Sequence, residues 1–97
     1  MEKNAVPKII AVMPAHNEEK HVYEVVKNTR KFVDEVIVVN DGSNDNTVLM
    51  AKKAGAIAVT HLVNMGLGFT LYTGVLAAIK RGADIIVTID SDGQHDP

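Results

Sequence analysis

The sequence predicts an α/β domain in which a parallel sheet, with strands in the order 3-2-1-4, is covered by helices on both faces. Three apolar runs, residues 9–13, 36–39 and 85–89, contain no alternating polar residues, and such runs are typical of strands buried on both faces. Helical patterns lie between them, so the elements alternate as βαβαβαβ and right-handed crossovers make the strands parallel. The switch point then falls between the first and fourth strands.

The first two strands, at residues 9–13 and 36–39, flank a predicted amphipathic helix. Its apolar side is formed, at helical spacing, by Val22, Val25, Val26, Phe32 and Val33. Asn17 precedes two glutamates, so we assign it as the N-cap of this helix.

A second, shorter helix is predicted at residues 47–54, with Asp45 as its cap and Gly55 just beyond its end. The weaker apolar run at 56–60 is assigned as the third strand. A third helix is expected at 69–81 and ends at Gly82. Its buried side is predicted to consist of Leu71, Val75, Ala78 and Ile79. The fourth strand is the run at 85–89.

Length, charge and composition limit the possible functions. The 97 residues form one predicted domain, 1–97, with a small core. The formal net charge of −2 gives no reason to expect nucleic acid as a partner. There is no cysteine, which fits a reducing compartment, and no apolar run approaches the ~18 residues of a membrane span. We therefore expect a cytoplasmic chain.

Acidic residues gather in the loops that follow the predicted strands. These loops contain Glu18, Glu19, Asp41, Asp45, Asp90, Asp92 and Asp96. With the helix boundaries given above they contain no lysine or arginine, so a phosphate ligand could be held only by helix N-termini and a bound cation. A cation about 6 Å from a phosphate charge contributes on the order of 3 kcal/mol per charge pair. The sequence therefore predicts metal-dependent binding of any phosphorylated ligand here.

Three of these acidic positions have alternative interpretations. Asp90 and Asp92 follow a buried strand, where a hard divalent cation could sit between them and a phosphate oxygen. Taken alone, an acidic turn closed by Gly93 is the simpler interpretation. Asp41, inside Asn-Asp-Gly-Ser, is either a turn residue or an acceptor for a nucleobase N–H or a ribose hydroxyl.

The remaining loop residues are less specific. Asn17 could be only a cap, and His16 could contact a base or ribose or be a plain loop residue. His21 and His61 are assigned to the surface or to packing. The segment from Gly66 begins like the dinucleotide motif G-x-G-x-x-G, but position 71 is Leu and the segment follows the third strand. A nicotinamide or flavin site is therefore disfavoured.

Four loop motifs follow one another in chain order: Pro14-Ala-His-Asn-Glu-Glu, Asn40-Asp-Gly-Ser-Asn-Asp-Asn-Thr, Asn64-Met-Gly-Leu-Gly with Gly74, and Asp90-Ser-Asp-Gly-Gln-His-Asp-Pro. Together they resemble the motifs of the inverting family 2 glycosyltransferases with the GT-A fold. The last, a DXD motif, is most similar to the dolichyl-phosphate mannose synthase and polyprenyl-phosphate glycosyltransferase branch. The resemblance covers residues 9–97. It implies that the Rossmann-like sheet is the nucleotide-binding half of a GT-A fold.

The resemblance also implies a donor, a cofactor and an acceptor. The donor would be a nucleotide-diphosphate sugar, linked to GDP or UDP, and the cofactor Mg²⁺ or Mn²⁺. The nucleotide-binding residues would be Pro14, Ala15, His16, Asn17, Glu18, Asp41, Gly42, Ser43, Gly66 and Gly68. Asp90, Asp92 and Gln94 would hold the metal against the diphosphate. The acceptor in that branch is a polyprenyl phosphate, so the full-length protein is expected to act at a membrane surface.

Two departures from the family pattern affect the expected activity. Leu67 stands where the family often has a basic residue, and the sequence stops at Pro97, before the family's acceptor-binding half. We therefore expect a donor-binding part that is inactive alone, with the catalytic residues beyond Pro97. The alternative is a non-catalytic α/β interaction or regulatory domain that keeps only the fold. An open edge at the fourth strand would favour a homo-oligomer.

Overall fold

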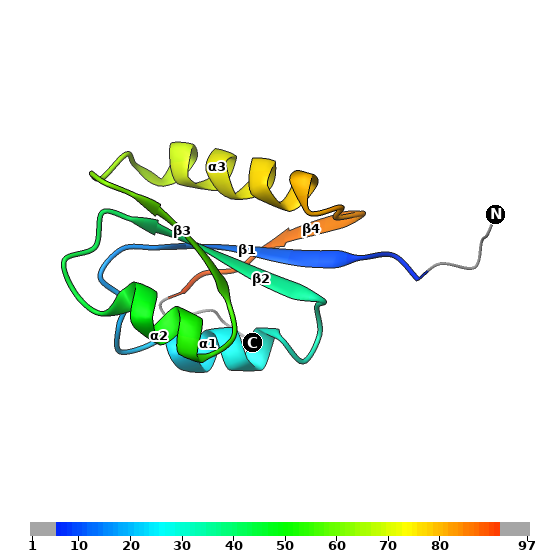
Figure 1. Cartoon of the computed structure of the whole chain (residues 1–97), viewed down its shortest axis with the longest axis horizontal. Helices are drawn as coiled ribbons and strands as arrows, with labels where there is room; N and C mark the ends of the chain where they lie inside the picture. Colours follow the sequence, from blue (N-terminus) through cyan, green and yellow to red (C-terminus); the bar gives the residue numbers. More distant parts are fainter. Residues whose placement is uncertain (1–5, 92–97) are drawn as a thin grey trace.

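The computed structural model describes residues 6–91 and confirms the predicted fold class (Figure 1). Four strands form one sheet: β1 (Ile9–Ala15), β2 (Glu35–Asp41), β3 (Ile57–His61) and β4 (Ile85–Thr88). All neighbouring pairs are parallel, and the order is β3-β2-β1-β4. The predicted order and the switch point between β1 and β4 are therefore correct.

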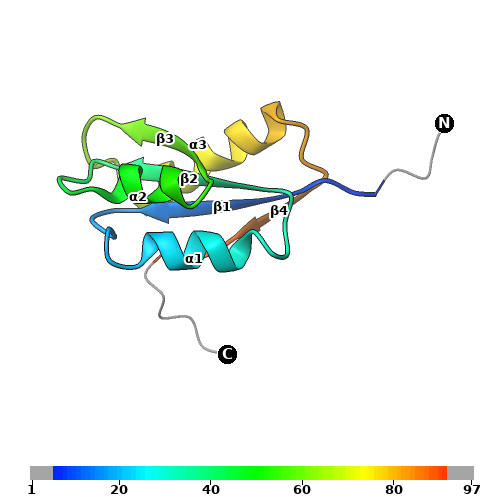
Figure 2. The ribbon, with the colours of Figure 1, turned by 60° about the horizontal axis from the view of Figure 1, so that its bottom comes forward.

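Three helices cover the two faces of this sheet. Helices α1 (Val22–Thr29) and α2 (Thr47–Lys53) lie on one face, and α3 (Leu67–Lys80) covers the other (Figures 1 and 2). Each face has its own apolar core, and the central strands β1 and β2 contribute alternate residues to both. Burial on both faces explains why these strands read as continuous apolar runs.

Helix α3 lies close to the sheet because its inner face consists of small residues. Thr70, Gly74 and Ala78 are the buried residues of the helix. A Cβ atom at Gly74 would overlap the side chain of Val12 and lie 3.1 Å from Cγ2 of Val39. Of the larger side chains of α3, Leu71 packs against this core, whereas Phe69, Tyr72, Leu76 and Ile79 are exposed.

At the end of the sheet where the strands begin, the carboxylate of Glu35 contacts two basic side chains from other segments of the chain. Glu35, the first residue of β2, accepts hydrogen bonds from Nε and Nη2 of Arg81 at 2.7 and 3.3 Å. Nζ of Lys8 lies 3.4 Å from the same carboxylate. The hydrogen bond from Arg81, with help from Lys8, lowers the pKa of Glu35. Two basic side chains, those of Lys8 and Arg81, thus lie at the end of the sheet opposite the acidic loops.

The predicted start and end of the first helix are wrong. The helix begins at Val22, with His21 at the cap position, and Asn17 instead adopts a left-handed conformation with φ of 55°. Its Oδ1 accepts a hydrogen bond from the backbone N–H of Asn44, so a contact from another loop replaces capping. The helix ends at Thr29, and Phe32 is consequently 79% exposed.

The second and third helices differ from prediction in smaller ways. Asn46, not Asp45, occupies the cap position of α2, although Oδ1 of Asp45 accepts the N–H of Thr47 at 3.0 Å. Helix α3 starts at Leu67, earlier than predicted. Ile79, predicted to be buried, is 58% exposed because Gly74 and Ala78 occupy the inner face.

The fourth strand lies at an edge of the sheet, as predicted. Within the described part of the chain it pairs with β1 alone, and Ile85 is 44% exposed. A groove of about 950 Å³ runs beside it against α1, and its wall includes Val25, Phe32 and Val87. Self-association through this edge stays a prediction. Among residues 6–91 no helix has the length and apolar character needed to cross a bilayer.

Candidate functional site

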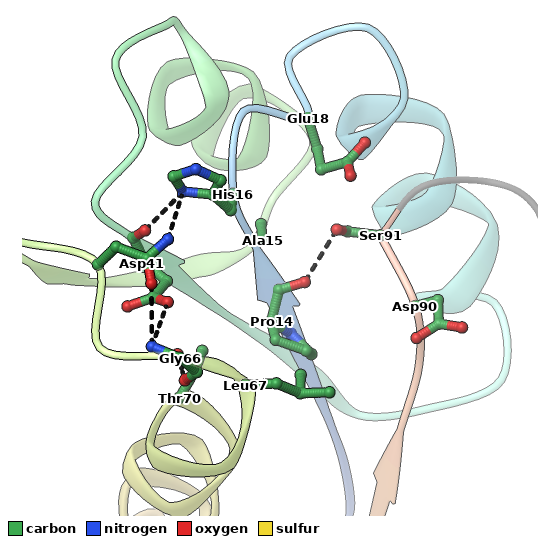
Figure 3. Close-up of a pocket in the computed structure, with 11 residues that line it drawn as sticks. Pro14, Ala15, His16, Glu18, Asp41, Gly66, Leu67, Thr70, Asp90 and Ser91 are labelled. Carbon is green, nitrogen blue, oxygen red and sulfur yellow. Dashed lines mark hydrogen bonds between the residues drawn. The ribbon is translucent and has the colours of Figure 1, made fainter.

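A pocket of about 280 Å³ opens at the carboxyl ends of the strands, beside the switch point. Its wall comes from β1 and the following loop, from the end of β2, from the start of α3 and from the segment after β4 (Figure 3). The lining residues are Pro14, Ala15, His16, Glu18, Asp41, Asn64, Gly66, Leu67, Thr70, Asp90 and Ser91. The sheet topology alone therefore brings four separate sequence segments to one site.

Asp41, the last residue of β2, is fixed by three hydrogen bonds. Its carboxylate accepts the backbone N–H of Met65 at 2.7 Å and of Gly66 at 3.0 Å, and lies 2.9 Å from Nδ1 of His61. Burial alone would raise the pKa of Asp41, but the bonds from His61, Met65 and Gly66 outweigh it and lower the pKa from 3.8 to about 2. The side chain is therefore an ionised, preorganised acceptor at the N-terminus of α3.

His61 supports Asp41, a role that the sequence analysis missed. Its Nδ1 faces Asp41, and its Nε2 lies 2.9 Å from Oγ1 of Thr73. Because the carboxylate of Asp41 can only accept, Nδ1 is the donor in this pair. The parallel register pairs Asp41 directly with His61. That pairing was the available signal, but it requires the strand order and register to be known first.

The loops after β1 and β2 are joined by hydrogen bonds between side chains and backbone. Oγ of Ser43 accepts the N–H of Asn17 at 2.8 Å, and Oγ1 of Thr47 accepts the N–H of Glu18 at 2.9 Å. Oε1 of Glu19 in turn accepts the N–H of Asn46 at 2.9 Å. These contacts hold the loop that carries His16 and Glu18 at the mouth of the pocket.

Gly42 allows a second close approach between loops. Its φ is 73°, and a Cβ there would lie 2.7 Å from the backbone nitrogen of Asn64. Only glycine meets both conditions without strain. The Asn-Asp-Gly-Ser motif therefore does more than turn the chain, since it brings the β3–α3 loop against Asp41.

The β4 side of the pocket is less firmly held. The hydroxyl of Ser91 donates to the carbonyl of Pro14 at 2.8 Å and fastens the chain beside β1. Asp90 is exposed and lies across Pro14 from Asp41 (Figure 3). The two other expected metal ligands, Asp92 and Gln94, lie outside the described residues.

The structure brings together part of the predicted nucleotide-binding set. Six of its members line the pocket, namely Pro14, Ala15, His16, Glu18, Asp41 and Gly66. The other four do not line the pocket. Asn17, Gly42 and Ser43 belong to the joined loops after β1 and β2, and Gly68 lies in the first turn of α3. Thr70 and Ser91 line the pocket, although neither was singled out from the sequence.

The charge of the site is acidic, as predicted, with one correction. Because α1 starts at Val22, Lys20 belongs to the loop after β1, so that loop is not free of bases. Lys20 lines the groove beside α1, however, and the pocket wall contains no lysine or arginine. No group of three His, Asp or Glu side chains within residues 6–91 could hold a metal by itself. Asp90 supplies one hard oxygen donor of the kind that Mg²⁺ and Mn²⁺ prefer.

A comparison with known protein families identifies the chain's relatives. The family described as glycosyl transferase family 2 matches residues 10–97, nearly the entire chain. The chain belongs to this family. Its GT-A fold is also that of glucosyl-3-phosphoglycerate synthase from Mycobacterium tuberculosis, crystallised with Mn²⁺, UDP-glucose and phosphoglyceric acid. That structure matches with a TM-score of 0.75 and 33% identity, over 88% of this chain and 33% of the other.

Two curated relatives are similar over most of this family 2 chain. UDP-N-acetylglucosamine–dolichyl-phosphate N-acetylglucosaminyltransferase from Methanococcus voltae is 38% identical, over 92% of this chain and 43% of its own length. An uncharacterised protein of Methanocaldococcus jannaschii is 47% identical, over 92% and 37%. The chain thus spans about two fifths of the length of these relatives.

Proposed function

We propose that this chain is the nucleotide-sugar-binding part of a metal-dependent inverting glycosyltransferase whose acceptor is a polyprenyl phosphate. One observation carries the proposal. The pocket at the strand ends is lined by three carboxylates, those of Glu18, Asp41 and Asp90, and by no lysine or arginine. Such a wall repels a diphosphate unless a divalent cation lies between them.

The two sides of the pocket have different proposed roles. Asp41 already accepts three hydrogen bonds, and a carboxylate has about four lone-pair sites, so it can accept one more N–H or O–H from the nucleoside. Asp90, together with Asp92 and Gln94, would hold the cation against the diphosphate. The bound cation would neutralise charge on the departing nucleoside diphosphate.

Of the two donor classes expected from the sequence, we favour UDP-sugars over GDP-sugars. The Mycobacterium tuberculosis enzyme was crystallised with UDP-glucose, and the name of the Methanococcus voltae relative gives a UDP-sugar donor and a dolichyl-phosphate acceptor. The same name supports a polyprenyl phosphate acceptor for this protein.

Calorimetric titration of UDP, with and without Mn²⁺, tests the proposal. We expect Mn²⁺ to raise the affinity by at least about tenfold, which corresponds to one metal-mediated contact of about 1.4 kcal/mol. Asp90→Asn and Asp92→Ala should each abolish this enhancement. Glu24→Gln is the control, because it removes the same charge from an exposed position on α1 that does not line the pocket.

The rival function is a non-catalytic interaction or regulatory domain. Wild-type protein that binds no UDP with or without Mn²⁺ would support this rival. Enhancement that survives in both aspartate variants would instead move the metal site away from β4.

A further inference from the structure

The outer face of α3 and the loop before it present an exposed apolar surface. Along α3 the exposed side chains recur every three or four residues, and in the loop Leu62 is 96% exposed. The residues of this α3 surface are Leu62, Val63, Met65, Leu67, Phe69, Tyr72, Leu76 and Ile79. Eight exposed apolar side chains along one loop and one helix are more than the singly scattered ones that are normal on a monomer, and such a grouping marks an interaction surface.

The charge around the α3 surface is distinctive. No aspartate, glutamate, lysine or arginine occurs between His61 and Ile79. The first charged residues that follow are Lys80 and Arg81. Arg81 is paired with Glu35, so Lys80 is the exposed base at the end of this face. A helix that is apolar toward the solvent as well as toward the core is expected to be covered. An apolar face that carries no acid and ends in an exposed lysine is complementary to an anionic lipid surface.

The α3 surface is continuous with the mouth of the pocket. Leu67 is 64% exposed and also lines the pocket, where it lies near Gly66 and Pro14 (Figure 3). Met65 belongs to the same surface, and its N–H holds Asp41. A ligand whose polar end enters the pocket could therefore leave its apolar part along this surface.

The position of α3 suits contact with a plane. It is the only described helix on its face of the sheet and forms the upper side of the molecule in Figure 1. Its 14 residues extend for about 21 Å, so a flat partner could touch Phe69 and Ile79 at the same time.

We propose that the α3 surface docks onto the face of a phospholipid bilayer and presents the pocket to a lipid-linked acceptor there. The inference rests on the proposed function in one respect, the polyprenyl phosphate acceptor. The phosphate of such an acceptor must reach the pocket while its hydrocarbon chain stays in the bilayer. Docking through α3 places the pocket mouth beside the bilayer, because Leu67 belongs both to the α3 surface and to the pocket wall.

Flotation with vesicles tests the surface without any nucleotide, so it is independent of donor binding. The probe is phosphatidylcholine vesicles that contain phosphatidylglycerol. We expect the chain to float with these vesicles and the double variant Leu62→Gln/Ile79→Gln to lose at least about tenfold in partitioning, because two large apolar side chains no longer become buried.

A matched control separates this surface from general hydrophobicity. Phe32→Gln/Leu49→Gln removes two side chains that are 79% and 50% exposed but lie with the α1–α2 layer, on the other face of the sheet. The control should float like the wild type, and all three proteins should have the same unfolding midpoint. Wild-type chain that does not float, or equal loss in both double variants, would overturn the proposal.

A second copy of the chain is an alternative occupant of the surface. Sedimentation of the same variants decides this point. A wild-type dimer that Leu62→Gln/Ile79→Gln converts to a monomer, in a chain that ignores vesicles, would assign the α3 surface to self-association. UDP binding that fails while flotation behaves as expected would remove the proposed donor site but leave the docking surface in place.

Discussion

The two sides of the pocket differ in how completely they are built. On the β2 side, Asp41 is buried, accepts three hydrogen bonds and belongs to a strand paired on both edges. On the β4 side, Asp90 is exposed and follows a short strand that pairs, among residues 6–91, with β1 alone. The comparison indicates that the side proposed to bind the nucleoside is preformed, whereas Asp90, on the side proposed to bind the metal, is not held by such contacts among the residues that the structure describes.

The largest expected effect is a difference in folding stability between Asp41→Ala and Asp90→Ala. Asp41→Ala leaves two backbone N–H groups and the His61 ring without their acceptor, so we expect a loss of about 3 kcal/mol in the free energy of unfolding. Asp90→Ala should change it by less than about 0.5 kcal/mol. Urea unfolding measures both values. Similar losses in the two variants would contradict the conclusion that the β2 side is held more firmly than the β4 side.

The second largest effect is expected in the pH dependence of the free energy of unfolding, which should show the contribution of Asp41 at acidic pH. Its pKa is about 2 in the folded chain and 3.8 ordinarily, so the unfolded chain binds the proton more readily. The resulting stabilisation is about 2 kcal/mol. It is fully present above about pH 4 and is lost as the pH falls through 2. Urea midpoints measured across this range should fall less steeply in Asp41→Asn than in the wild type.

A smaller loss in the free energy of unfolding is expected when a methyl group is added at Gly42, on the β2 side of the pocket. Gly42→Ala forces a left-handed conformation on alanine and pushes its Cβ against the backbone of Asn64, which should cost between about 1 and 2 kcal/mol. Gly68→Ala is the matched control, because it lies in α3 with nothing within 4 Å of the new Cβ. Thermal unfolding should show Gly68→Ala unchanged or slightly stabilised, and the reverse ranking would contradict the structure.

The smallest expected effect concerns the support behind Asp41. Thr73→Val keeps the side-chain shape but removes the hydroxyl that faces Nε2 of His61, so we expect a loss of about 1 kcal/mol. Thr60→Val, at an exposed position of β3, provides the control. If Thr73→Val proved as stable as its control, the hydrogen bond between Thr73 and His61 would contribute nothing to the β2 side.

The fold could be predicted because its signals are local. Continuous apolar runs mark β1 and β2, and the alternation of strands and helices leads to the strand order through the handedness of the crossovers. The site was predictable in part for the same reason, since Pro14, Asp41 and Asp90 lie at strand ends that the topology brings together.

The remaining features depend on contacts between loops. Asn17 has the local pattern of a helix cap, but its backbone N–H is bound by Ser43 and its side chain by Asn44. His61 acquires its role only through the register of β3 on β2. Neither contact has a local sequence signal, because each joins residues that are 20 or more positions apart.

The two carboxylates at the ends of β2 have a joint consequence for α3. Asp41 binds the chain where that helix begins, and Glu35 binds Arg81 where it stops. Seven residues of strand and fourteen of helix both extend for roughly 20 Å. The length of β2 therefore has to match the length of α3. We expect a single-residue insertion in either element to break the contact at Asp41 or the contact at Glu35. Lengthening must be shared by both segments if the domain is to keep its shape.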